Sequence, residues 1–88
     1  MEENLDWLEP PTLEDVAHLP RYRAENFSDA MELVRWVRQK QPFVLSIEGM
    51  PTEVSRRIVD FLSGAVFLAE GSIHRLTMDH FLITPPED

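Results

Sequence analysis

The sequence predicts an α/β sandwich of order β-α-β-α-β-β, in which two helices pack on one face of a small mixed sheet. Three observations lead to this fold class. Two segments carry apolar residues at helical spacing. A nearly continuous apolar run, residues 43–47, lies between Pro42 and Gly49, as in a buried central strand. Two short strand-like segments then close the chain on either side of a turn.

The chain is long enough for a single domain, and its acidic excess lies at its ends. Of the 88 residues, we expect 1–19 to form an acidic lead-in, mobile or partly docked, and 20–88 to form the core domain. Within the lead-in, Met1, Leu5 and Leu8 fall at helical spacing before a proline pair ends any helix. The net charge of −8 comes from the ends, so we expect no dense basic patch and no nucleic-acid partner.

The first half of the core is expected to hold an edge strand and a helix. The strand spans about Val16 to Arg23, and Pro20 suits an edge because proline cannot donate to a ladder. Ser28 is expected to cap the following helix, with Asp29 in its first turn, where an acid suits the helix dipole. The apolar stripe of this helix comprises Ala30, Leu33, Val34 and Val37.

The second half is expected to hold the central strand, a second helix and a hairpin. Thr52 is predicted to cap the helix, which runs to about Ala69. The helix ends at Glu70 and Gly71, with Gly71 in the left-handed conformation. The closing strands span residues 72–76 and 80–84, joined by a loop of residues 77–79.

Gly64 lies inside the second helix, where a glycine costs about 1 kcal/mol relative to alanine. A helical wheel puts Gly64 on the outer side, opposite the core residues. Because a missing Cβ lets a second backbone approach, we expect self-association through Gly64, Arg57, Asp60 and Phe67. A tolerated surface glycine remains the alternative. The expected core side comprises Val54, Ile58, Val59, Phe61, Leu62, Ala65, Val66, Leu68 and Ala69.

The closing hairpin is expected to be apolar on both faces. Its pairing places Arg75 opposite Phe81 and Ile73 opposite Ile83, all four on one face. The other face carries His74, Leu76, His80 and Leu82. Because the helices cover only one face, a second subunit or a peptide must cover the other, and we assign it to the face with Arg75 and Phe81. We therefore expect a homodimer, a common remedy for a small core.

The sequence contains no catalytic motif. It lacks cysteine and a glycine-rich phosphate loop. His18, His74 and His80 are too few and too poorly spaced for zinc, and we expect them to be polar strand or surface residues. We expect no enzymatic activity, no cofactor and no metal. Without a basic leader or a membrane-length apolar run, a cytoplasmic domain is expected.

Three sequence blocks carry a family resemblance. The segment RRIVDFLSGAVF, followed by GSIHR and FLITPP, resembles SepF, a bacterial cell-division protein family, and the similarity covers about residues 21–86. The resemblance implies a domain that dimerises, often forms curved polymers and binds the C-terminal tail of FtsZ at the division septum, without enzymatic activity. By position, it implies that Arg75 and Phe81 belong to the FtsZ-peptide site, flanked by Ile73 and Ile83, and that Gly64 lies at the polymer contact.

One departure from the family and two alternatives remain. SepF proteins usually begin with a basic amphipathic helix that binds the membrane, whereas residues 1–19 here are acidic, which puts direct membrane contact in doubt. A dimeric ligand-binding regulatory module of similar topology is one alternative function. A SepF-like assembly domain that does not bind FtsZ is the other.

Overall fold

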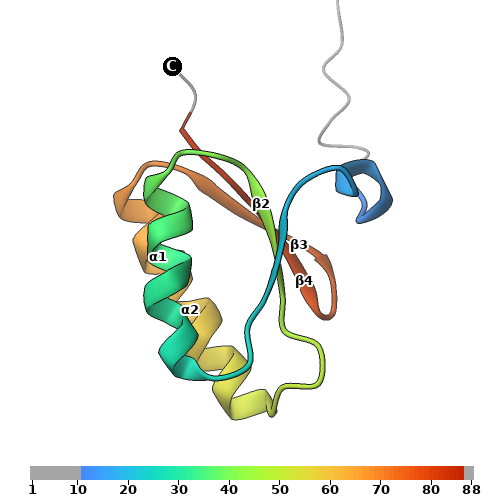
Figure 1. Ribbon diagram of the computed structural model, residues 1–88, viewed down its shortest axis with the longest axis vertical. Helices are drawn as coiled ribbons and strands as arrows, with labels where there is room; N and C mark the ends of the chain where they lie inside the picture. Colours follow the sequence, from blue (N-terminus) through green and yellow to red (C-terminus); the bar gives the residue numbers. More distant parts are fainter. Residues whose placement is uncertain (1–10, 87–88) are drawn as a thin grey trace, which may run out of the picture.

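The computed structural model describes residues 11–86 and has the predicted fold class (Figure 1). Its four strands lie in the order β1-β2-β4-β3, with β1 parallel to β2 and the other pairs antiparallel. Helices α1 and α2 pack side by side on one face of this mixed sheet. The bounds are η2 Glu14–Val16, β1 Arg21–Arg23, η3 Phe27–Asp29, α1 Ala30–Arg38, β2 Phe43–Ser46, α2 Thr52–Leu68, β3 Ser72–Thr77 and β4 His80–Thr84.

Strand β2 is the buried centre of the fold, as its sequence predicts. All four of its residues are buried, and it lies between β1 and β4. Phe43 and Leu45 point toward the helices, whereas Val44 points to the opposite face of the sheet. The helix-side core also contains Ala24, Leu33, Val37, Ile47, Ile58, Leu62, Val66, Phe81 and Ile83.

Both predicted helix caps differ from the observed starts. A short 3-10 turn, η3, precedes α1, and the Asp29 carboxylate accepts hydrogen bonds from the backbone N–H groups of Glu25 at 2.7 Å and Asn26 at 3.4 Å. Ser28 therefore lies inside the turn and does not cap α1. Thr52 is the first residue of α2 rather than its cap, because Pro51 occupies the cap position in an extended conformation.

The left-handed residue after α2 is Glu70 and not the predicted Gly71. Glu70 has a φ of 64°, whereas Gly71 does not have a positive φ. Gly71 is required for a different reason, because a Cβ there would collide with the carbonyl oxygen of Thr84. Within α2, Phe61 is 41% and Leu68 is 82% exposed, so the predicted core side was too wide. The fully buried stripe of α2 comprises Ile58, Leu62 and Val66, and Val54, Val59 and Ala69 are partly buried against the same core.

The chain before Pro20 packs on the sheet instead of forming a strand. Residues 14–16 form η2, and β1 begins only at Arg21, because proline has no N–H for the ladder. On the sheet face opposite the helices, Leu13, Val16 and Leu19 form one hydrophobic cluster with Val44, Leu76 and Leu82. We call residues 12–19 the strap. The expected turn at Met1, Leu5 and Leu8 lies outside the described residues.

The closing hairpin has the predicted register with a shorter loop. Arg75 pairs with Phe81 and Ile73 with Ile83, as expected. Thr77 pairs with His80, however, so the loop contains two residues, and Leu76 is an extra residue at a shift in register.

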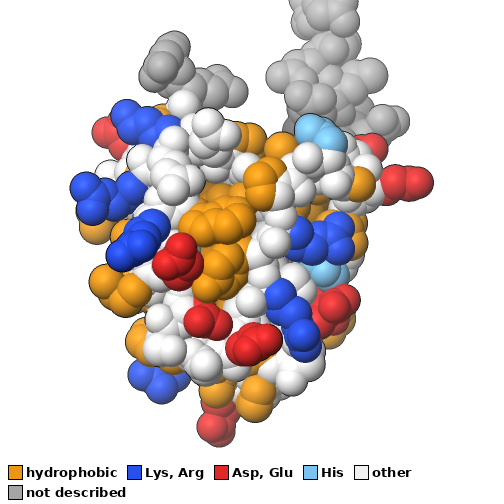
Figure 2. Space-filling view, in the orientation of Figure 1, with side chains coloured by type: hydrophobic (Ala, Val, Ile, Leu, Met, Phe, Trp, Pro, Cys, Tyr) orange, Lys and Arg blue, Asp and Glu red, His pale blue; other side chains and the backbone are white. Residues whose placement is uncertain are grey.

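The described residues form no extended surface of one charge on the face shown in Figure 2. On the face shown in Figure 2, basic side chains lie in separate groups with acidic side chains between them. Neither α1 nor α2 is long and apolar enough to cross a membrane.

Candidate functional site between α2 and the closing hairpin

A hollow of about 290 Å³ opens where the first half of α2 faces the closing hairpin. Strand β3 contributes Arg75, β4 contributes Phe81, and the end of β2 contributes Ile47. The α2 wall consists of Thr52, Ser55, Arg56, Val59 and Asp60. We call this hollow the groove. It combines apolar surface with two arginines and one acid.

Arg75 and Phe81 form the hairpin wall of the groove. They are cross-strand partners, and the guanidinium carbon of Arg75 lies 5.0 Å from the ring centroid of Phe81. The same guanidinium donates to the carbonyl oxygen of Met78 at 3.5 Å. Phe81 is 5% exposed and belongs to the helix-side core. The buried ring therefore positions an exposed cation at the groove.

Ile73 and Ile83 do not line the groove. Ile83 is 2% exposed beneath the helices, and Ile73 is half-buried against the same core. The face with Arg75 and Phe81 was expected to lack cover, and this expectation is wrong, because it is the face that the helices cover.

The groove includes residues that the sequence did not single out. Arg56, Val59 and Asp60 lie at positions i, i+3 and i+4 of α2 and therefore on one face of the helix. Asp60, expected at a self-association surface, lines the groove. The spacing of Arg56 and Val59 was visible in the sequence, but their placement opposite the hairpin depends on long-range packing.

The outer face of α2 holds the other predicted residues. A Cβ added at Gly64 would have no described heavy atom within 4 Å, apart from the backbone of the same helix and the two neighbouring residues. Gly64 therefore faces open space. Phe67 is 78% exposed. Arg57 is engaged within its own chain, with its guanidinium carbon 4.5 Å from the ring centroid of Phe27. Gly64 and Phe67, together with exposed Leu68, form an apolar strip on this face.

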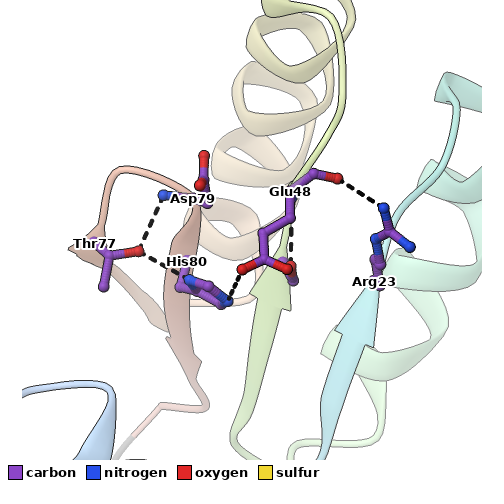
Figure 3. A network of polar contacts seen from close by, with 6 residues as sticks. Arg23, Glu48, Thr77, Asp79 and His80 are labelled. Carbon is purple, nitrogen blue, oxygen red and sulfur yellow. Dashed lines mark hydrogen bonds and ion pairs between the residues drawn. The ribbon is translucent and has the colours of Figure 1, made fainter.

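A polar network joins the hairpin to the turn after β2 (Figure 3). The buried His80 ring lies with Nδ1 2.9 Å from the Thr77 hydroxyl oxygen and Nε2 3.7 Å from the Glu48 carboxylate. Arg23 donates to the carbonyl oxygen of Glu48 at 3.1 Å. Because Ile47 and Thr52 flank this turn, the network fixes that end of the groove. No three metal-ligating side chains gather within residues 11–86.

Comparison with known proteins gives one family. The family model described as "Cell division protein SepF" matches residues 21–87. The cell division protein SepF of Acetivibrio thermocellus is 39% identical over 69% of this chain and 39% of its own length. That of Ruminiclostridium cellulolyticum is 39% identical over 67% of this chain and 38% of its own. The chain thus spans about two fifths of the length of these relatives.

A solved structure agrees with the fold. The SepF-like protein from Archaeoglobus fulgidus superposes with a TM-score of 0.70, covering 78% of this chain and 86% of that one, at 17% sequence identity. The family-model match covers all of β1, both helices, β2 and the hairpin, including every residue that lines the groove. The chain belongs to the SepF family of cell division proteins.

Proposed function

We propose that this chain is a non-enzymatic adaptor in cell division, which binds the C-terminal tail of FtsZ in the groove between α2 and the hairpin. The observation that supports this most is the meeting of Arg75 and Phe81 in one groove. These are the residues that the family resemblance assigns to the FtsZ-peptide site. Their contact gives the site a cation beside an aromatic ring.

The groove suits a peptide that combines a carboxylate with apolar side chains. Arg75 and Arg56 can donate charge-assisted hydrogen bonds to carboxylates from opposite walls. Val59, Ile47 and Phe81 offer apolar contact between them. A bound tail would therefore bridge α2 and the hairpin, and its affinity would depend on both walls.

Scaffolding is the proposed mechanism. Two copies joined as a homodimer would present two grooves and bridge two FtsZ tails, gaining avidity from modest single-site affinity. Further assembly would use the outer strip of α2, where Gly64 leaves room and Phe67 is exposed. These activities would place the protein on the cytoplasmic side of the division septum.

A titration of a fluorescent FtsZ tail peptide with the full chain tests this function. We expect saturable binding that weakens roughly tenfold in Arg75→Ala, about the free energy of one charge-assisted hydrogen bond. Arg38→Ala is the matched control, because Arg38 is an exposed arginine at the end of α1, outside the groove. Absence of binding at high micromolar concentration would leave only the assembly role or a different ligand.

A further inference from the structure

Strand β1 forms one edge of the sheet, and its outer side has no partner. Among the strands of residues 11–86, only β2 lies beside it. At the ends of β1, the carbonyl oxygen of Pro20 and the N–H of Ala24 bond to β2. Because backbone groups alternate in direction along a strand, Tyr22 also bonds to β2, whereas the N–H and C=O groups of Arg21 and Arg23 point outward. No hydrogen bond within the described chain satisfies these outward groups.

Arg21 and Arg23 give one face of this edge a positive charge. Both residues are exposed. Arg21 is the register partner of Val44, which belongs to the cluster under the strap, so alternation places both arginines on the strap face of the sheet. Arg23 donates to the neutral carbonyl oxygen of Glu48. Within residues 11–86, neither guanidinium has a carboxylate oxygen within 4.0 Å. Two exposed cations therefore lie along the open edge.

Negative charge borders these two arginines. Tyr22 lies on the helix side of the edge, where burial and then the charges of three acids raise its pKa. These acids are Asp29, Glu32 and Glu25. Beyond the end of β1, Arg23 lines a hollow of about 230 Å³ together with Glu25 and Glu48. An added strand is therefore favoured when it has carboxylates opposite the two arginines and uncharged or basic side chains at the positions between and beyond them.

A second copy of this chain does not suit the edge. A two-fold axis through Tyr22 would pair β1 with its copy in antiparallel orientation and set Arg21 opposite the Arg23 of the second copy, twice. Like charges directly opposite one another destabilise a strand pair, and charged edge residues commonly prevent self-pairing. The same two cations attract a strand that carries carboxylates at alternate positions.

We propose that the outer edge of β1 binds an extended acidic segment of a protein partner, which adds a further strand to the sheet. The backbone of the segment pairs with Arg21 and Arg23, and two of its carboxylates, at positions i and i+2, accept charge-assisted hydrogen bonds from the two guanidinium groups. The groove lies by β3, at the other edge of the sheet. The two sites are therefore separate, and this inference does not depend on the proposed function.

Two synthetic peptides of equal composition and charge test the pairing. Acetyl-TETETETE-amide has carboxylates at i and i+2, whereas acetyl-TEETTEET-amide, the control, has none at that spacing. Each peptide is titrated into the isotope-labelled full chain. Because N–H groups that enter a ladder are protected, we expect amide exchange at Arg21 and Arg23 to slow about tenfold when about nine-tenths of the protein has bound the alternating peptide. Exchange at Tyr22, which already bonds to β2, should not change.

A pair of arginine variants separates a specific contact from bulk charge. Arg21→Gln should weaken binding of the alternating peptide roughly tenfold, about the free energy of one hydrogen bond to a charged group. Arg38→Gln removes the same charge from an exposed residue at the end of α1 and should bind as the wild type does.

Four outcomes would overturn the inference. Absence of binding at millimolar peptide would exclude the site. Equal affinity for the two peptides, or equal weakening in the two variants, would reduce the effect to net charge. Unchanged exchange at Arg21 and Arg23 in the peptide-saturated protein would exclude strand addition. Chemical-shift changes confined to Arg56, Val59 and Arg75 would assign the acidic peptide to the groove instead.

Discussion

The guanidinium carbon of Arg75 lies 5.0 Å from the ring centroid of Phe81, its cross-strand partner in the closing hairpin. The two residues have different surroundings despite this contact. Arg75 is exposed at the groove, whereas Phe81 is 5% exposed in the helix-side core. Substitution of Phe81 should therefore mainly lower stability, whereas substitution of Arg75 should mainly weaken peptide binding.

Truncation of the ring should destabilise the fold. We expect Phe81→Ala to lower the free energy of unfolding by about 3 kcal/mol, because it leaves a cavity among Leu45, Ile47 and Ile58. Arg75→Ala should change it by less than about 0.5 kcal/mol, since the side chain is at the surface. Urea denaturation of both variants measures the difference. Equal losses would mean that Arg75 has a structural role.

A long side chain at Gly64 should reduce assembly without preventing folding. No described side chain approaches the position, so Gly64→Ala should raise the free energy of unfolding by roughly 0.5–1 kcal/mol through higher helix propensity. Gly64→Lys should fold equally well but give smaller assemblies in sedimentation velocity, because a long charged side chain keeps a second helix away. Assemblies of wild-type size in Gly64→Lys would remove Gly64 from the contact.

The turn after α2 contains two residues with opposite backbone requirements. Glu70 has a φ of 64°, which is unfavourable for a residue with a Cβ, so Glu70→Gly should stabilise the fold by about 1 kcal/mol. Gly71→Ala should destabilise it, because the new Cβ would collide with the backbone of Thr84. Thermal unfolding of the two variants should show shifts in opposite directions. Shifts of the same sign would contradict this assignment.

Sequence patterns were most successful where the cause of structure is local. The apolar run of β2, the strand His80–Thr84 and the pairing of Arg75 with Phe81 follow from alternation and from nearby turn residues. Residues 16–19 of the strap were predicted as part of a strand, because Val16 and Leu19 have an apolar pattern that suits either structure. Only the tertiary structure shows that they cover the second face of the sheet.

The groove illustrates the remaining limit of sequence reasoning. Its hairpin wall could be predicted, since strand register fixes which residues are opposite one another. Its α2 wall could not, because a helical wheel gives the direction of Arg56 and Val59 but not the element that they face. For the same reason the wheel placed Phe61 and Leu68 in the core, although the two side chains are 41% and 82% exposed.

Tyr22, the single tyrosine of the sequence, should link stability to alkaline pH. Burial, followed by the charges of Asp29, Glu32 and Glu25, raises its pKa above the ordinary value of 10.0. Because the folded-state pKa exceeds the unfolded one, this contribution to stability is complete below pH 10.0 and disappears as the pH rises through the higher folded-state value. The free energy of unfolding, measured in urea across this window, should therefore fall more steeply for the wild type than for Tyr22→Phe. The substitution keeps the edge-to-face contact with Trp36, whose ring centroid lies 5.3 Å away, so both proteins should have similar stability at neutral pH. Parallel curves for the two proteins above pH 10.0 would show that Tyr22 titrates as it does in the unfolded chain.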